Sequence, residues 1–273
     1  MKLSSSHTEK QKLALHNPHL KRLRQRLEQL NHTTTGLLPA LFKLVNQYQH
    51  SIVQTFKANQ NCYLCAGKSQ RQICQWCVND MPTLASNSKY TNLLNSPAIA
   101  DAICHQYFDR LFIPLSYEWP ISLVLKDFKF AQKTWLVDSL NDMLTAHIQK
   151  AYAEQTMPEA ILPVPIHNKR YAQRMYNQAS LLAQEVGLTL KLPVLHQHAF
   201  RTRNTTAQTE LTGKQRRTNT SSAFSCADMQ PWQHIAIIDD VVTTGATVNA
   251  LAQTLKKSNP KLKIDIWALA ISI

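Results

Sequence analysis

The sequence of 273 residues has few acidic side chains for its size. Aspartate and glutamate number 17 against 30 lysines and arginines, which gives a formal net charge of +13. A chain this basic favours a polyanionic partner, such as nucleic acid, an anionic lipid surface or a heavily phosphorylated small molecule. Basicity without a binding role is the alternative, because the cations are spread over several segments.

Long apolar runs and glycine-rich loops are also missing. The N-terminus lacks the continuous apolar region of a secretory signal peptide, and no stretch reaches the length of a membrane span. The expected location is therefore the cytoplasm, where paired cysteines are more often metal ligands than disulfides. With only five glycines, the chain contains neither GxxxxGK followed by Ser or Thr nor GxGxxG, which excludes those two phosphate-binding loops.

The first 58 residues form an N-terminal extension. Residues 1–18 are polar, which predicts a mobile segment. Between Leu20 and Leu30 leucines recur at helical spacing among lysines and arginines, and a second helical pattern runs from Leu37 towards Phe56. The first helix is expected either to cover its own domain or to dock on nucleic acid or a membrane surface.

Residues 59–82 contain two CxxC pairs separated by eight residues. The four cysteines are Cys62, Cys65, Cys74 and Cys77. Four thiolates at this spacing can surround zinc tetrahedrally, which predicts a structural zinc knuckle with no open coordination position. A redox dithiol is the weaker interpretation, because one CxxC pair would suffice for it.

Other side chains in and beyond the knuckle have two interpretations each. Lys68, Arg71 and Trp76 can contact nucleic acid, or they can be solvated surface residues with one packing aromatic. The isolated Cys104 and Cys226 are expected to be buried as small apolar groups.

Residues 83–118 are expected to join the knuckle to the main domain at residues 119–273. This join includes a predicted helix over AIADAICHQYFDRLF, residues 98–112. One or two helices are expected over residues 121–150, where Lys126 and Lys129 are interpreted as surface charges.

A buried strand is predicted over residues 161–170, ended by Pro163 and Pro165. The segment YAQRMYNQASLLAQEVG then predicts one helix, stopped by Gly187. The polar residues 198–224 have no strong periodicity, and a segment of that length in a compact domain is usually functional or disordered.

A strand, two acids and a small-residue turn lie between His234 and Ala250. The apolar run Ile235–Ile238 predicts a strand buried on both faces, followed by Asp239 and Asp240 at its carboxyl end. The turn Thr243–Thr247 then leads into a helical pattern and offers hydroxyls, backbone N–H groups and a helix dipole to a phosphate. An ordinary strand-to-helix turn is the competing interpretation.

The final apolar segment, residues 263–273, predicts a last strand. Strands and helices therefore alternate along the main domain. This alternation predicts an α/β fold with parallel strands and right-handed crossovers.

These features resemble the ComF family, competence-associated proteins with a four-cysteine zinc motif ahead of a type I phosphoribosyltransferase domain. The matching features, which cover roughly residues 55–273, are CxxC-x8-CxxC, LKDFKFAQ, PVPIHNKRYAQRMYNQA and the stretch HIAIIDDVVTTGATVNA. The last stretch resembles the signature that binds phosphoribosyl pyrophosphate (PRPP). Spaced loop residues also match, namely Arg201, Gln208, Leu211, Arg216, Asn219, Ala223 and Phe224.

The resemblance implies a phosphoribosyltransferase-like parallel sheet flanked by helices and a site for PRPP with Mg²⁺. It implies that Asp239 and Asp240 bind the ribose hydroxyls and that Thr243, Thr244, Gly245, Ala246 and Thr247 bind the 5′-phosphate. A basic loop is expected to close over the pyrophosphate or to be merely solvated, with Arg201, Arg203, Lys214, Arg216 and Arg217 as its cations.

One family motif departs from its usual form. The family commonly has Arg-Gly-Phe-Asn-Gln where this chain has Arg174, Met175, Tyr176, Asn177 and Gln178. Met175 adds bulk where glycine would allow a close approach of backbone or ligand.

The sequence leads to one main functional hypothesis and two alternatives. The main hypothesis is a cytosolic PRPP-binding protein, acting in DNA uptake with other uptake proteins and contacting single-stranded DNA. The first alternative is a zinc-stabilised DNA-binding module whose phosphate loop is not catalytic. The second is a nucleotide-salvage phosphoribosyltransferase, which would show turnover on a free base.

Overall fold

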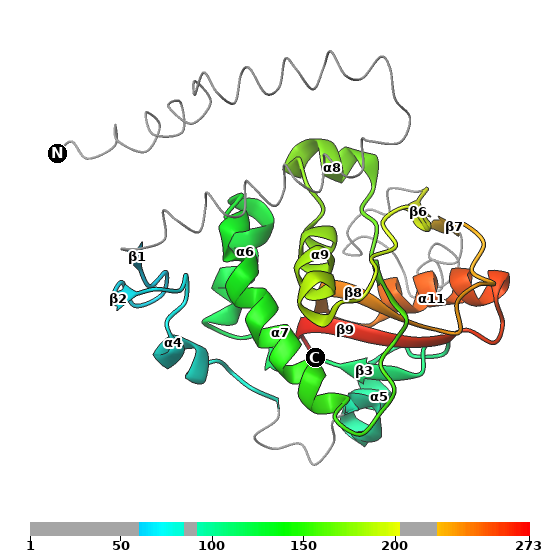
Figure 1. Ribbon diagram of the computed structural model, residues 1–273, viewed down its shortest axis with the longest axis horizontal. Helices are drawn as coiled ribbons and strands as arrows, with labels where there is room; N and C mark the ends of the chain where they lie inside the picture. Colours follow the sequence, from blue (N-terminus) through cyan, green and yellow to red (C-terminus); the bar gives the residue numbers. More distant parts are fainter. Residues whose placement is uncertain (1–59, 85–91, 203–222) are drawn as a thin grey trace. The chain divides into compact units, whose positions relative to one another are not determined.

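The computed structural model describes residues 60–84, 92–202 and 223–273 (Figure 1). The chain divides into two units, Met1–Asn59 and Gln60–Ile273, and every described residue belongs to the second. The helices expected in the N-terminal extension lie outside the described residues. Among the described helices, none has the length and apolar character needed to cross a membrane.

The elements of the second unit have the following bounds, in chain order: β1 (Gln60–Asn61), β2 (Lys68–Ser69), α4 (Gln75–Asn79), η1 (Leu93–Asn95), α5 (Pro97–Ala102), β3 (Arg110–Phe112), β4 (Leu115–Ser116), α6 (Ile121–Phe130), η2 (Thr134–Leu136), α7 (Val137–Ala151), β5 (Ala160–Pro163), α8 (Asn168–Arg174), α9 (Gln178–Leu190), β6 (Ala199–Arg201), β7 (Phe224–Cys226), β8 (His234–Val242), α11 (Ala246–Ser258) and β9 (Lys263–Ile271).

The central sheet has the strand order β3-β9-β8-β5, and β4 also pairs with β9. Every pairing in this sheet is parallel. Parallel neighbours need a crossover connection, and helices supply it here, as between β8 and β9 through α11. The predicted α/β class with a parallel sheet is therefore confirmed.

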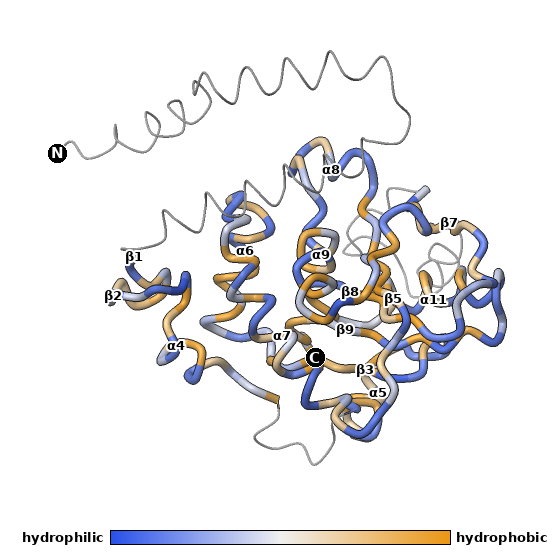
Figure 2. The backbone as a smooth tube through the Cα atoms, in the orientation of Figure 1, coloured by the Kyte–Doolittle hydropathy of each residue, from blue (hydrophilic) through white to orange (hydrophobic). Residues whose placement is uncertain are grey.

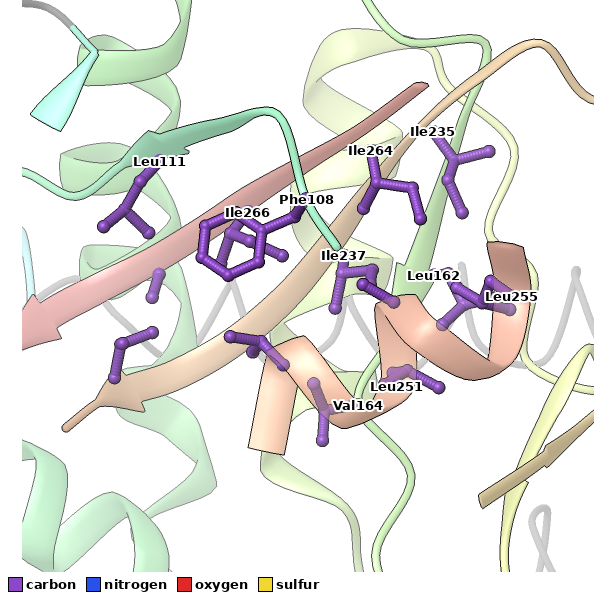
Figure 3. Packing of buried hydrophobic residues seen from close by; sticks show 14 of the residues in the cluster. Phe108, Leu111, Leu162, Val164, Ile235, Ile237, Leu251, Leu255, Ile264 and Ile266 are labelled. Atoms are coloured by element: carbon purple, nitrogen blue, oxygen red, sulfur yellow. The ribbon is translucent and has the colours of Figure 1, made fainter. Parts of the chain in front are cut away.

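The sheet is buried on both faces because successive residues of its inner strands point to opposite sides. Ile235 and Ile237 of β8 belong to a cluster that includes Leu251 of α11 (Figure 3). Ala236 and Ile238 belong to the cluster on the other side. Continuous apolar runs suit this double burial, and the sheet is mostly hydrophobic (orange in Figure 2).

Different helices cover the two faces. Helix α11 packs on one face through Val248, Leu251 and Leu255. Helices α6, α7 and α9 pack on the other, with Phe128, Leu144 and Leu182 among their buried residues. Helix α8 follows the carboxyl end of β5, and the carboxyl ends of parallel strands form the edge at which such sheets bind ligands.

Two small antiparallel sheets stand apart from the central one. Strands β1 and β2 pair within the cysteine-rich segment, and β6 pairs with β7. The β6–β7 pair brackets residues 203–222, which lie outside the described residues. Both ends of the predicted basic loop are therefore fixed beside the domain.

The helix expected over residues 98–112 is wrong beyond its first turns. Helix α5 ends at Ala102, and residues 110–112 form β3 at the edge of the sheet. Pairing with β9 overrides the local helical pattern, because residues 110–112 all have pairing partners in residues 265–267 of β9.

The single helix expected over residues 171–187 is also wrong, because α8 and α9 are separate. Met175 takes a left-handed φ of 66° and ends α8, and Lys191, not Gly187, caps α9. Gly187 lies inside α9, where an added Cβ would approach Val194 Cγ2 to 2.6 Å. This glycine is therefore explained by close packing against Leu192 and Val194, and not by termination of the helix.

Candidate functional site

The two predicted acids lie near the carboxyl end of β8, although this strand continues past the expected end to Val242. Strand β9 runs to Ile271 and provides pairing partners for these extra residues. Asp240 is buried and Asp239 is half-buried. The backbone N–H of Asp240 donates to Asp239 Oδ1 at 2.9 Å, so the two acids also contact each other.

Asp240 forms an ion pair that the sequence did not indicate. Lys129 Nζ of α6 lies 2.8 Å from one carboxylate oxygen of Asp240 and 3.1 Å from the other. Lys129 is therefore not the surface charge that was expected, whereas Lys126 is exposed. The helical spacing of α6 alone could not show which of its lysines reaches a carboxylate 111 residues away.

The neighbouring acid has a different proton affinity. Burial raises the pKa of Asp239 to about 8, and the charge of Asp240 adds to the rise. With its pKa raised in this way, Asp239 readily holds a proton at neutral pH. The two adjacent carboxyls can accept hydrogen bonds from the hydroxyl groups of a ligand, and a protonated Asp239 can also donate one. A cation nearby would lower the pKa of Asp239.

The family-motif residues hold this ion pair in place. Gln178 Nε2 donates to the backbone oxygen of Lys129 at 3.1 Å, and Tyr176 donates to that of Phe128. Asn177 caps α9 and also donates to Val164 O at 3.0 Å. The motif therefore ties α8 and α9 to β5 and to the end of α6.

Met175 occupies the position where the family commonly has glycine. Its φ of 66° lies in the left-handed region, and its side chain is 69% exposed. The methionine side chain, which was expected to obstruct a close approach, lies in solvent instead. Glycine is therefore favoured at this position because it adopts positive φ without steric cost. A long unbranched residue tolerates this φ at a cost of about 1 kcal/mol.

Substitutions at Met175 are therefore expected to follow backbone preference. Met175→Val should lower the free energy of unfolding by about 1–2 kcal/mol, since a β-branched residue strongly disfavours positive φ. Met175→Gly should leave it unchanged or raise it by up to about 1 kcal/mol. Urea unfolding measures both, and Gln173→Gly in α8 is the control, expected to destabilise by about 1 kcal/mol. Equal stability of the Val and Gly variants would contradict this explanation.

The predicted phosphate turn lies at the N-terminus of α11. Gly245 has a φ of 71° and precedes the first helical residue, while Thr243 and Thr244 are exposed. The first N–H groups of this 13-residue helix have no intrahelical partner, and its dipole favours an anion.

Gly245 is required for packing as well as for its positive φ. An added Cβ would approach Ile103 Cγ2 to 2.7 Å and Cys104 O to 2.8 Å. Cys104 N donates to Thr244 O at 2.9 Å, and Asn249 Nδ2 donates to Cys104 Sγ at 3.1 Å. The segment after α5 thus supports the turn, and Cys104 is exposed instead of buried as expected.

Arginines from two further elements approach the acids. Burial lowers the pKa of Arg201, the charge of Arg170 lowers it further, and Asp239 opposes this effect. Burial and Arg170 likewise lower the pKa of Arg174, which Asp240 raises. Cations that repel one another beside two carboxyls form a site suited to an anionic ligand.

Of the five basic residues predicted for the covering loop, Arg201 is described and lies in β6. The other four, Arg203, Lys214, Arg216 and Arg217, lie outside the described residues. The sequence did not predict that Lys129 or Arg170 belongs to the site, although both lie within the matched segments. Their positive charge could be read from the sequence, but their closeness to the two acids could not.

The four cysteines of the two CxxC pairs come together. Their sulfur atoms all lie within 4.8 Å of one another. Cys62 Sγ lies 3.8 Å from Cys77 Sγ, and Cys65 Sγ lies 3.7 Å from Cys74 Sγ. A tetrahedral ion with metal–sulfur bonds of about 2.3 Å separates its sulfurs by about 3.8 Å. The cluster is therefore within metal-binding distance.

The electrostatics of the cluster also suit a cation. Burial would raise the pKa of Cys62, but backbone N–H groups of Cys65, Cys74 and Leu64 outweigh it and lower the pKa to about 6. Burial and the neighbouring sulfurs raise the pKa of Cys77. Cys62 therefore loses its proton easily, whereas Cys77 holds its proton firmly while no cation is bound. A cation bound to all four sulfurs would stabilise the thiolate form of each.

Polar contacts seat the cysteine-rich segment on the main domain. Gln72 Nε2 donates to Asp138 Oδ2 at 2.8 Å, and Ser139 Oγ donates to Gln72 Oε1 at 3.1 Å. Lys133 Nζ lies 2.6 Å from Asp127 Oδ2, which also accepts from Tyr63. The cluster is therefore part of a fixed surface beside α6 and α7.

Comparison with known proteins finds relatives named for competence and for DNA utilization. No family model matches the sequence. The chain is 35% identical over 168 residues to competence protein F of Haemophilus influenzae, covering 60% of this chain and 73% of that protein. It is 28% identical over 214 residues to DNA utilization protein YhgH of Escherichia coli K12, covering 76% of this chain and 88% of that protein. It is 29% identical over 217 residues to the Salmonella typhi protein of that name, covering 76% and 95%. The chain belongs to the ComF family, the family of competence protein F.

Proposed function

We propose that the carboxyl edge of the sheet binds PRPP together with Mg²⁺. The observation that carries this proposal is the cationic surrounding of two adjacent acids. Lys129 Nζ lies 2.8 Å from Asp240, and the charges of Arg174 and Arg201 interact with those of Asp240 and Asp239. Arg170 repels both of these arginines. Closely placed cations beside two acids suit a ligand that has both phosphates and hydroxyls. PRPP has both, and it needs a hard cation with oxygen ligands.

Each part of the site has a proposed role in holding this ligand. The turn Thr243–Thr247 would bind the 5′-phosphate through hydroxyls and the N–H groups that open α11. Asp239 and Asp240 would accept hydrogen bonds from the ribose hydroxyls, and Mg²⁺ would bridge hydroxyls and pyrophosphate. The pyrophosphate would lie near Arg201, with Arg203, Lys214, Arg216 and Arg217 as further candidate partners.

For the cysteine cluster we propose a structural Zn²⁺ ion. Its support is the match between the observed sulfur separations of 3.7 Å and 3.8 Å and a tetrahedral zinc–thiolate site. Cys62, Cys65, Cys74 and Cys77 would fill all four positions, so the ion would stabilise the segment and have no part in chemistry.

The proposed role is the uptake and processing of DNA in the cytoplasm. Two kinds of relative carry names that point this way, competence protein F and DNA utilization protein. The net charge of +13 suits contact with single-stranded DNA. Binding of PRPP is separate from transfer of its phosphoribosyl group, for which an acceptor would also be needed.

A ligand series tests which parts of PRPP the site recognises. With Mg²⁺ present, PRPP should stabilise the protein against urea more than ribose 5-phosphate does, and inorganic phosphate least. A ligand at 100 times its dissociation constant adds about 2.7 kcal/mol to the free energy of unfolding. Removing Mg²⁺ should weaken the effect of PRPP and leave that of inorganic phosphate unchanged.

The two alternative functions give different results in the same assays. A DNA-binding module without a working ligand site would show no greater stabilisation by PRPP than by phosphate. A salvage enzyme would release pyrophosphate when PRPP and a free nucleobase are supplied together. Equal stabilisation by all three ligands would contradict PRPP recognition.

A further inference from the structure

Helices α6 and α8 expose an unusual number of large apolar side chains. Five of them are Trp119, just before α6, with Leu123 and Phe130 of α6, Tyr171 of α8 and Met175 at its end, which are 76%, 41%, 66%, 51% and 69% exposed. We call this surface the α6–α8 face. Large apolar side chains exposed on neighbouring elements often mark a binding site.

A contact between a cation and an aromatic ring links the two helices, whose places in the fold are labelled in Figure 1. Arg174 of α8 lies over the Phe130 ring of α6, with Cζ 4.7 Å from the ring centroid. Leu123, Lys126 and Phe130 are spaced by three and four residues, which places them on one side of α6. Helix α8 has no buried residue, so core packing does not account for its exposed Tyr171.

Most of the charged side chains on this face are cations. Residues 160–184 contain no aspartate or glutamate but include Lys169, Arg170 and Arg174. On α6, Lys126 is exposed, and the one carboxylate, Asp127, is paired with Lys133. Glu118, next to Trp119, accepts a hydrogen bond from Ser116 Oγ at 2.7 Å. An anionic ligand would therefore meet mostly cations along both helices.

We propose that the α6–α8 face binds single-stranded DNA, an inference that rests on the proposed role in DNA uptake. Bases stack on the rings of Trp119, Phe130 and Tyr171, and phosphates pair with Lys126 and Lys169. Aromatic rings alternating with cations are the chemistry of single-strand binding platforms. A strand that stacks on Phe130 would pass the end of α6, where Lys129 of the Lys129–Asp240 pair is the preceding residue.

The cysteine-rich segment is a less suitable platform. Among residues 60–84, Trp76 is the one aromatic residue whose side chain is mostly exposed, at 81%. Arg71 pairs with Asp142 at 3.6 Å, which partly satisfies its charge. A single exposed ring beside Lys68 and a partly paired Arg71 offers fewer stacking positions than the three rings of the α6–α8 face.

The test uses the full-length protein and a fluorescent oligothymidine of about 20 nucleotides, followed by anisotropy at several salt concentrations. Trp119→Ala and Tyr171→Ala should each weaken binding about tenfold, since base stacking on one ring contributes about 1–3 kcal/mol. Lys126→Ala should weaken binding and reduce the salt dependence by about one phosphate contact.

Matched controls come from exposed residues on other surfaces. Leu188→Ala on α9 and Lys150→Ala on α7 should bind DNA as the native protein does. Trp76→Ala should have less effect than Trp119→Ala. Unchanged PRPP binding by every variant confirms that each one is folded, because no substituted side chain belongs to the proposed ligand site.

The outcomes separate this inference from the proposed function. If native protein binds DNA but the face variants match the controls, the face is not the binding surface and the DNA role stands. If native protein binds no DNA, both fail, while PRPP binding is judged by its own titration. A face variant that alters oligomeric state and leaves DNA affinity unchanged would overturn the inference in favour of a second copy of this chain.

Discussion

Replacing Asp265 with asparagine is expected to lower the free energy of unfolding by about 3–5 kcal/mol. The Asp265 side chain is fully buried in β9 and pairs with Arg110 of β3 at 2.6 Å and with His234 of β8 at 2.6 Å. Tyr152, the residue after α7, also donates to it. Asparagine removes the negative charge and leaves the largely buried Arg110 guanidinium without its counter-ion.

This network also predicts a pH dependence. Burial would raise the pKa of Asp265, but hydrogen bonds from His234, Arg110 and Tyr152 outweigh it and lower the pKa. A lowered folded pKa means that the stabilisation is present above the unfolded value of about 3.9 and is lost as the pH falls below it.

Urea unfolding between pH 7 and pH 3 measures both effects. The native protein should lose stability below about pH 4, and the part due to Asp265 should be missing in Asp265→Asn. Asp101→Asn, at an exposed position in α5, is the control and should change stability by less than about 0.5 kcal/mol. An Asp265→Asn variant as stable as this control would contradict the structural role of the network.

Replacing Cys65 with serine is expected to weaken zinc binding by roughly a hundredfold. Structural zinc sites bind with about 10–16 kcal/mol, or roughly 3 kcal/mol for each of four thiolates. Cys65 is exposed, so the substitution removes a ligand without opening a cavity in the core. Cys104→Ser, at another exposed cysteine, should keep the native metal content.

Metal analysis and thiol titration of the purified proteins measure this prediction. Native protein and Cys104→Ser should carry about one zinc ion per chain, and Cys65→Ser should lose it to a chelator far sooner. Loss of zinc should also make residues 60–84 sensitive to protease, because two short strands and one short helix hold that segment together. Native protein with free thiols and metal in fewer than about half of its molecules would overturn the zinc proposal.

Local patterns were sufficient for the central parts of the fold. The apolar run Ile235–Ile238 predicted a strand buried on both faces, and the structure has it between two clusters. The CxxC spacing predicted a four-sulfur cluster, and the sulfurs lie within 4.8 Å of one another. Each of these features depends on residues close together in the sequence.

Features that depend on distant partners were not predictable. Lys129 meets Asp240 across 111 residues, and Arg110 meets Asp265 across 155. Strand β3 forms at residues 110–112 only because β9 accepts it. The break at Met175 was missed for another reason, since a methionine gives no local signal of positive φ.

The hydrogen bonds of the family motif suggest how the two proposed binding surfaces communicate. Gln178 donates to the backbone oxygen of Lys129, which pairs with Asp240 in the proposed ligand site. The next residue, Phe130, lies under Arg174 on the α6–α8 face. A ligand that draws Lys129 or Arg174 towards its phosphates would therefore alter the face, and each ligand would change the affinity of the other by the same factor.

Calorimetric titration of the full-length protein with PRPP and Mg²⁺ tests the central proposal most directly. Native protein and the Asp101→Asn control should bind PRPP at one saturable site. Asp239→Asn combined with Asp240→Asn should weaken binding at least tenfold, because the ribose hydroxyls lose both carboxyl partners. Absence of binding by the native protein, or native affinity in the double variant, would contradict the proposal that this edge of the sheet is a PRPP site.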